Sequence, residues 1–306
     1  MRGIFLACLA STTLALAAGL TQAQAAQTIR VAYAGSMGVV MDRFLGPAFA
    51  KAHEAQYQGI GQGAYGLAHL LAAKKMQADV FVSVTPGPIE ILKKAGLIGA
   101  AVPVASTQMV IAYSPKSRFA PALKAASAGG APWWQVLQSK GLRFGRTDPA
   151  TDPQGQNIIL MMKLAGRYYH QPNLAKTILG PTGNPAQIFT EPSLLSRLES
   201  GQLDASSGYQ SAVISHHLPY VKLPDQLNLS NPAMVQGWYS KVNFRMVTKT
   251  GQRKTVSPQP LVFYATVLNN APDHALGEAF LSFLQSPAGQ TMLKQNGYAA
   301  PKGGNL

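Results

Sequence analysis

The sequence contains little cysteine, few acidic residues and, after its first 25 residues, no long apolar segment. Cys8 is the only cysteine, so we expect the rest of the chain to form no disulfide and to depend on its hydrophobic core. No later apolar run approaches the ~20 residues of a membrane-spanning helix, and we find no internal repeat. With 306 residues and 47% apolar content, the chain is long enough for one large domain or two of medium size.

The shortage of acid leaves the chain strongly basic, with 26 Lys and Arg against 12 Asp and Glu and a net charge of +14. The basic residues are scattered, and the nearest approach to a run is the pairs Lys74-Lys75, Lys93-Lys94 and Arg253-Lys254. Because no basic patch is interleaved with aromatic residues, we expect no nucleic-acid partner. A positive field would instead draw anions toward a cleft.

Residues 1–25 have the pattern of a secretory signal peptide. Arg2 gives a positive start, residues 4–20 are apolar, and Ala23-Gln24-Ala25 supplies a small-x-small cleavage site. We therefore predict cleavage before Ala26 and a periplasmic protein. An uncleaved anchor is the alternative.

The remaining chain alternates short apolar runs with helical patterns, which predicts an α/β fold. The nearly continuous apolar run Asp79–Val84 is typical of a strand buried on both faces, and Val39–His53 has the spacing of an amphipathic helix. Further strands are predicted at Thr28–Ala34, Val110–Tyr113, Leu142–Gly145, Ala205–Tyr209 and Leu261–Leu268. Further helices are predicted at Leu67–Lys75, Pro88–Ala95, Trp133–Leu137, Gln156–Tyr169, Ser193–Glu199, Asp273–Leu284 and Ala288–Lys294.

The segment between Tyr113 and Val262 has the strands and helices of a complete α/β unit, inserted within another. We therefore predict two lobes joined by two crossing strands, with a cleft between them. Residues 26–113 together with 262–306 form the first predicted lobe, and residues 114–261 form the second.

Gly35-Ser36 directly follows the first predicted strand and precedes a helix. A serine hydroxyl there, together with free N–H groups at the helix start, favours an anion-binding site. Two alternatives remain. Residues 34–38 are close to the G-x-S-x-G nucleophile elbow of serine hydrolases, although that fold places further strands and an oxyanion loop before the elbow. Ser36 could also serve only as a helix cap.

Residues 61–66 read Gly-Gln-Gly-Ala-Tyr-Gly, a literal G-x-G-x-x-G motif. A dinucleotide site needs a preceding strand, and only a short stretch around residues 57–60 precedes this motif. We favour a glycine loop whose backbone N–H groups face a ligand at the start of the next helix, with an ordinary turn as the alternative.

Two further polar loops, residues 148–156 and 208–212, each connect a strand to a helix. Their candidate ligand-binding residues are Thr151, Asp152, Tyr209 and Ser211. These side chains can hydrogen-bond a ligand, or they can serve only as a helix cap and a polar turn. The adjacent His216-His217 pair lacks a further ligand at metal-binding spacing, so we predict no metal site.

Taken in this order, the four loops resemble those of the tungstate/molybdate-binding receptors of ABC importers. The resemblance runs from about Ile29 to Pro301. It includes the segments Ala34-Gly35-Ser36, Ala78-Asp79-Val80-Phe81-Val82-Ser83, Asp152-Pro153-x-Gly155, Tyr209-x-Ser211, Leu223-Pro224-Asp225-x-Leu227-Asn228-Leu229, Asn269-x-Ala271-Pro272, Phe280-x-x-Phe283-Leu284-x-Ser286-x-x-Gly289 and Asn296-Gly297. It implies a two-lobed type II periplasmic binding protein, or Venus flytrap, with the ligand held between the lobes.

The resemblance also implies which residues bind the ligand. The family's binding positions fall on Ser36, Asp152, Tyr209 and Ser211, and its second serine aligns with Ala64. Their loop neighbours Gly35 and Thr151 are further candidate ligand-binding residues. Ala64 replaces the family's second serine and leaves only a backbone N–H, and Thr85 replaces the acid that often follows Ser83. The second carboxylate, which some members use to extend metal coordination, aligns with Ile214. These departures leave open a different oxoanion or a small organic anion.

We therefore predict an exported monomeric receptor that captures a small oxoanion of the tungstate/molybdate kind for an ABC permease in the inner membrane. It is expected to be no enzyme and to need no cofactor, because neutral hydroxyls and helix N-terminal N–H groups would replace the water around the anion. The alternatives are an exported serine hydrolase that uses Ser36 and a ligand-binding sensor subunit.

Overall fold

The computed structural model describes residues 27–248 and 251–306. The predicted signal peptide and its cleavage site before Ala26 lie outside these residues. Within them, no helix is both long and apolar enough to cross a membrane.

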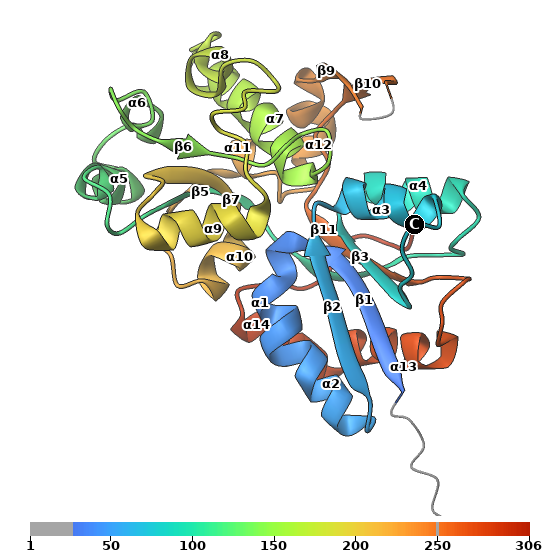
Figure 1. The fold of residues 1–306 in the computed structure, drawn as a ribbon. Coiled ribbons are helices and arrows are strands. Elements are labelled where there is room, and N and C mark those ends of the chain that lie inside the picture. Colours follow the sequence, from blue (N-terminus) through green and yellow to red (C-terminus); the bar gives the residue numbers. More distant parts are fainter. Residues whose placement is uncertain (1–26, 249–250) are drawn as a thin grey trace, which may run out of the picture.

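The first lobe is built on a five-stranded sheet with the order β2-β1-β3-β11-β4 (Figure 1). Its strands are β1 (Thr28–Ala34), β2 (Gln56–Gln62), β3 (Val80–Val84), β4 (Val102–Ser106) and β11 (Val262–Val267). β1 pairs in parallel with β2 and β3, whereas β11 runs antiparallel to β3 and β4. All residues of β3 and β11 are buried, which explains why both read as continuous apolar runs.

Helices cover this sheet. The predicted helix Val39–His53 is α1 (Gly38–Val40), a π-helical turn η2 (Met41–Leu45) and α2 (Gly46–Ala52) in succession. The others are α3 (Ala64–Ala72), α4 (Pro86–Lys94), α13 (His274–Gln285) and α14 (Pro287–Gln295). In Figure 1, α3 and α4 lie side by side, with α3 beginning directly after β2. The start of α3 therefore lies at the end of an edge strand.

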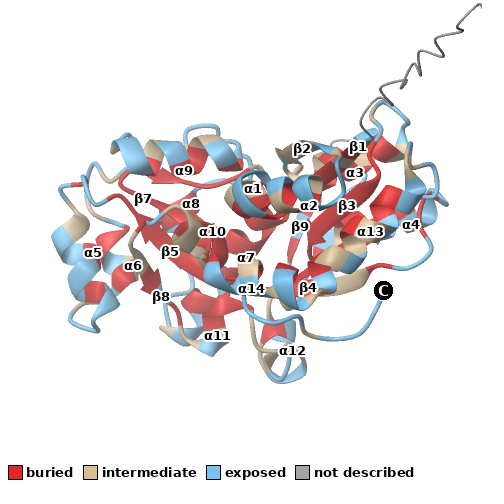
Figure 2. Ribbon diagram, turned by 90° about the horizontal axis from the view of Figure 1, so that it is seen from below, coloured by how far each residue is buried: buried red, intermediate tan, exposed pale blue. Residues whose placement is uncertain are grey.

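The second lobe has a four-stranded sheet with the order β6-β7-β5-β8. Its strands are β5 (Met109–Tyr113), β6 (Phe144–Gly145), β7 (Ala205–Tyr209) and β8 (Tyr220–Lys222). Its helices are α5 (Ala120–Ser127), α6 (Trp133–Val136), α7 (Pro153–Tyr168), α8 (Leu174–Leu179), α9 (Glu191–Ser200), α10 (Gln210–Ser215) and α11 (Asp225–Asn228). Figure 2 shows that buried residues are concentrated in the strands of both sheets.

The chain passes between the sheets twice. The first passage lies between Ser106 and Met109, because β4 belongs to the first sheet and β5 to the second. The predicted boundary after Tyr113 is therefore too late. The two passages touch: the Thr107 N–H donates to the Leu261 carbonyl at 3.1 Å, and the Leu261 N–H donates to the Leu229 carbonyl at 3.0 Å.

The second passage carries an excursion that is not among the predicted elements. It contains α12 (Met234–Gly237), a 3-10 turn η3 (Tyr239–Lys241) and an antiparallel hairpin of β9 (Phe244–Val247) and β10 (Arg253–Val256). Figure 1 shows the hairpin beside α12. The hairpin thus follows the second lobe in sequence and precedes the strand that re-enters the first.

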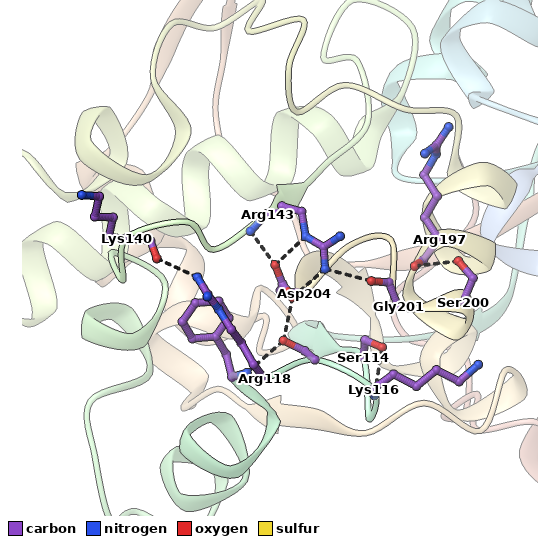
Figure 3. Close-up of polar contacts among 11 residues, drawn as sticks. Ser114, Lys116, Arg118, Lys140, Arg143, Arg197, Ser200, Gly201 and Asp204 are labelled. Atoms are coloured by element: carbon purple, nitrogen blue, oxygen red, sulfur yellow. Dashed lines mark hydrogen bonds and ion pairs between the residues drawn. The ribbon is translucent and has the colours of Figure 1, made fainter.

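Hydrogen bonds to the Asp204 carboxylate from Arg143 and Ser117 hold neighbouring segments of the second lobe together (Figure 3). The Asp204 carboxylate accepts hydrogen bonds from the Arg143 backbone at 2.8 Å, the Arg143 guanidinium at 2.9 Å and the Ser117 hydroxyl at 2.7 Å. Burial alone would raise the pKa of Asp204, but these hydrogen bonds outweigh it and lower the pKa to about 2. The carboxylate therefore joins β6, β7 and the segment after β5.

Candidate functional site

A cleft of about 1040 Å³ lies where the two lobes face each other. The first lobe contributes the glycine loop and the exposed side of α3, and the second contributes the loops before α7 and α9. The lining residues are Gly61, Gln62, Gly63, Gly66, His69, Leu70, Ala73, Lys75, Thr147, Asp148, Ala150, Thr151, Asp152, Ile188, Phe189, Thr190, Glu191 and Pro192. The predicted glycine loop and the predicted Asp152 loop therefore meet across one cleft.

Ser36 lies behind this cleft, in the 3-10 turn η1 (Gly35–Met37) that follows β1. It is only 4% exposed, and its hydroxyl has no hydrogen-bond partner among the residues that the structure describes. Gly35 beside it faces the second lobe, since a Cβ built there would lie 3.4 Å from the Cβ of Glu191. A buried hydroxyl with free bonding capacity is available to a ligand.

Asp152 is the N-cap of α7, and its carboxylate accepts the Gln154 N–H at 2.8 Å. Burial raises the pKa of Asp152 most and the charge of Asp148 adds to this, while the hydrogen bond from the Gln154 backbone lowers it, and together these effects place the pKa at about 7. The Thr151 side chain is not the part that bridges the lobes. The Thr151 backbone carbonyl bridges the lobes, because it accepts a hydrogen bond from the Gly66 N–H at 3.1 Å.

Glu191 is a second buried carboxylate and is not among the residues predicted from the sequence. It begins α9 and is 3% exposed. Gln154 Nε2 donates to its Oε1 at 2.6 Å, and the Gln154 Oε1 accepts the Ser207 hydroxyl at 2.9 Å. Burial and then the charge of Asp152 raise the pKa of Glu191, while hydrogen bonds from the Ser36 backbone and from Gln154 lower it. The protonation of Glu191 therefore depends on both Asp152 and the Ser36 backbone.

Tyr209 is the last residue of β7 and Ser211 lies in the first turn of α10, and neither is among the residues that line the cleft. Tyr209 is fully buried, and its phenol oxygen accepts Asn157 Nδ2 at 3.0 Å. Burial and then Asp152 and Glu191 raise the pKa of Tyr209, so the phenol keeps its proton and can donate it. The Ser211 hydroxyl instead donates to Thr107 Oγ1 at 3.0 Å, in the first passage between the lobes.

The glycine motif has a packing explanation. The strand β2 does precede it, contrary to expectation, but a Cβ at Gly61 would lie 2.5 Å from the Tyr33 ring and one at Gly63 would lie 2.6 Å from the Thr151 carbonyl oxygen. Ala64 is fully buried at the first position of α3. Glycine at position 61 leaves room for the Tyr33 ring, and glycine at position 63 lets the Thr151 backbone of the second lobe approach closely.

The two remaining family positions lie elsewhere. Thr85, at the N-cap of α4, has a φ of +93° and donates its N–H to the Val262 carbonyl at 3.0 Å. Ile214, on α10, packs against Gly297, where a built Cβ would lie 2.8 Å from the Ile214 Cβ. The buried carboxylate that accompanies Asp152 is therefore Glu191 and does not come from position 214.

His69 and Lys75 line the cleft, but neither pairs with the two buried acids. Within residues 27–248 and 251–306, no Lys, Arg or His forms an ion pair with Asp152 or Glu191, and no three His, Cys, Asp or Glu side chains converge as metal ligands. His216 contacts Glu199 at 2.6 Å through Nδ1. That contact gives no support to a Ser36–histidine pair of a hydrolase.

Residues 29–299 match the model of the family described as bacterial extracellular solute-binding protein. The chain belongs to that family. It is therefore a solute-binding protein, which agrees with a ligand-sized cleft between two lobes.

Three similar proteins show how far the similarity extends in sequence and in structure. An uncharacterized solute-binding protein of Petrotoga mobilis is 29% identical over 287 residues, which cover 91% of this chain and 86% of that one. The molybdate/tungstate-binding protein WtpA of Pyrococcus abyssi is 31% identical over 212 residues, covering 63% of this chain and 59% of WtpA. The periplasmic molybdate-binding protein of Azotobacter vinelandii has a TM-score of 0.59 at 17% identity, covering 90% of this chain and 100% of that one. The predicted type II periplasmic binding fold is confirmed.

Proposed function

We propose that this solute-binding protein is exported to the periplasm and captures a small oxoanion of the tungstate/molybdate kind for an ABC permease. The observation that carries the proposal is the site itself. Two buried carboxyl groups, Asp152 and Glu191, both act on the pKa of the Tyr209 phenol, and Glu191 also interacts with the backbone of Ser36, whose buried hydroxyl has no partner among the described residues. The similarity to WtpA supports the same ligand class.

Neutral donors would hold the anion. The Ser36 hydroxyl, the Tyr209 phenol and the backbone N–H of Ala64 can replace water around it, each contributing roughly 1.5–3 kcal/mol as a hydrogen bond to a charged group. Low water content in the closed cleft strengthens these bonds.

The two carboxylates limit which anion fits. An ionised carboxylate repels an anion unless it binds the central atom through its oxygen, and a protonated carboxyl can donate a hydrogen bond. The raised pKa values of Asp152 and Glu191 allow the second mode near neutral pH. An oxoanion with a metal centre allows the first, because such a centre can accept a further oxygen ligand.

Capture would follow from lobe closure. The passages at Thr107, Leu261 and Leu229 are held together by backbone hydrogen bonds, so they can serve as a hinge. The Gly66–Thr151 hydrogen bond links the lobes at the mouth of the site. The permease would recognise the closed form.

The proposal is tested by a thermal-shift panel on residues 26–306 with tungstate, molybdate, sulfate, phosphate, thiosulfate and small carboxylates at equal ionic strength. A ligand at 100 times its dissociation constant stabilises by about 2.7 kcal/mol. Tungstate or molybdate should raise the melting temperature, and Ser36→Ala should abolish most of that rise. Ser127→Ala, at an exposed serine of α5, is the control and should respond like the wild type.

A shift with another anion only would retain the capture mechanism and replace the ligand. No shift with any anion would refute the oxoanion proposal, leaving a solute-binding protein with a different ligand.

A further inference from the structure

The β9–β10 hairpin contacts the first lobe through one basic residue, Lys254. Its Nζ donates a hydrogen bond to the phenol oxygen of Tyr65 at 3.1 Å and lies 4.7 Å from the centroid of the same ring. Tyr65 is the second residue of α3 and is only 8% exposed. The hairpin is thus joined to the helix that begins at the glycine loop.

Tyr65 lies within the electrostatic reach of the site. After burial, Asp152 and Glu191, it also contributes to the raised pKa of Tyr209. Gly63 and Gly66, just before and after Tyr65 in the chain, line the cleft, and Gly66 donates its N–H to the Thr151 carbonyl. Movement of Tyr65 would therefore move the part of the first lobe that faces the ligand.

The phenol is also confined from its other side. A Cβ built at Gly87, in the first turn of α4, would overlap the Tyr65 hydroxyl. Any larger residue at position 87 would displace the ring, so the close approach of the glycine backbone and the contact with Lys254 together fix its position.

The hydrogen bond has a fixed direction. An ammonium group can only donate, so the phenol oxygen of Tyr65 is the acceptor and its own O–H proton remains free to donate. A cation at the oxygen polarises that O–H and makes it a stronger donor. This matters because no Lys, Arg or His in the described part of the chain pairs with the site carboxylates.

We propose that Lys254 is a positioning residue of the anion site, which acts through Tyr65 to hold the start of α3 against the bound ligand and to slow its release. The proposal rests on anion capture in the cleft. It assigns a function to the hairpin through its contact between Lys254 and Tyr65.

Arg253 provides a matched control. It precedes Lys254 in β10, pairs across the hairpin with Val247 and has an exposed side chain. Lys254→Gln and Arg253→Gln therefore remove the same charge from adjacent positions, one facing Tyr65 and the other facing solvent.

The experiment measures tungstate and molybdate binding to the mature chain by calorimetry and stopped-flow for wild type, Lys254→Gln, Arg253→Gln, Tyr65→Phe and the Lys254→Gln/Tyr65→Phe double variant. Lys254→Gln should weaken affinity about tenfold, mainly through faster dissociation, whereas Arg253→Gln should change it less than about twofold. The double variant should bind like the weaker single variant, because both changes break one contact.

Equal losses in Lys254→Gln and Arg253→Gln would show a general field effect and overturn the proposal, as would additive losses in the double variant. A Lys254→Gln protein that loses affinity only because it melts earlier without ligand would also overturn it. If the wild type binds neither anion, the proposed function fails together with this role; wild-type binding with Lys254→Gln unchanged refutes this role alone.

Discussion

Gly63 is a point of close approach between the lobes, and alanine there should impair ligand binding without impairing folding. A Cβ at Gly63 would lie 2.6 Å from the carbonyl oxygen of Thr151 and 3.2 Å from the Cβ of Asp152. The backbone of Gly63, with φ −57° and ψ 120°, is allowed for alanine. The penalty therefore arises only when the lobes are closed.

The size of this penalty follows from the contact between a Cβ at Gly63 and the Thr151 carbonyl oxygen. The oxygen belongs to the backbone and cannot rotate away, so the lobes must remain slightly apart or the loop must shift, which typically costs about 1–3 kcal/mol. If only the closed form retains ligand, the dissociation constant should rise about 5- to 150-fold.

Gly66 is the matched control for this prediction. A Cβ there would lie 3.9 Å from the Cβ of Thr151, an ordinary contact, and the position is helical. Gly66→Ala should therefore keep affinity within about twofold and raise the melting temperature slightly, as alanine favours a helix over glycine. Calorimetric titration with tungstate and a thermal melt of the ligand-free proteins measure both effects. Unchanged affinity in Gly63→Ala, or a ligand-free melt lowered as much as the affinity, would refute the closure argument.

Three further changes test the electrostatics. Asp204→Asn should lower the free energy of unfolding by about 1–2 kcal/mol at pH 7, a value reduced because Arg143 is half exposed. Because the pKa of Asp204 is lowered in the folded protein, the difference measured by denaturant titration should disappear as pH falls from about 4 through 2. The pH dependence of stability has the opposite sign for Asp152, because its raised pKa makes the free energy of unfolding fall as pH rises from about 4 to 7. Asp152→Asn keeps the cap oxygen for Gln154, so this variant should be more stable than wild type at pH 8 by about 1–3 kcal/mol, seen as a higher melting temperature, and should match it at pH 4. A lower melting temperature at pH 8 would contradict that assignment. Ser36→Ala should leave the ligand-free melting temperature unchanged or slightly higher, since its buried hydroxyl has no partner to lose, and a large drop in a thermal melt would show a structural role instead.

Much of the fold could be predicted because the strands are apolar runs bounded by turn residues. The strands Thr28–Ala34 and Ala205–Tyr209 have the predicted bounds. Ser36, Asp152 and Tyr209 follow strands or start helices, so the local pattern was enough to select them. Their convergence required the two lobes to face each other, which the resemblance implied.

Glu191 could not be predicted for a physical reason. An acid in the first turn of a helix is common at the surface, where it complements the helix dipole, and nothing in the local sequence distinguishes a buried one. Its burial depends on tertiary contacts, including the packing of α9 against Gly35 and the hydrogen bond from Gln154. The β9–β10 hairpin is hard to predict because each strand has only four residues and β10 has a single buried residue, Val256.

The chain is basic, whereas the proposed site contains two buried carboxyl groups, so the approach of an anion and its retention depend on different residues. A net charge of +14 attracts any anion to the cleft and acts mainly on the association rate. Inside, Asp152 and Glu191 oppose an anion that can neither accept a carboxyl proton nor bind a carboxylate oxygen, and two like charges 4 Å apart at an effective dielectric constant of 20 repel by about 4 kcal/mol. Under the proposed function, sulfate, whose sulfur accepts no further oxygen ligand, would meet this repulsion in full once the acids are ionised, whereas the metal centre of tungstate or molybdate could accept a carboxylate oxygen as a ligand. The basic surface therefore does not by itself favour one anion over another, and under the proposed function we expect the two buried acids to contribute to the discrimination between anions.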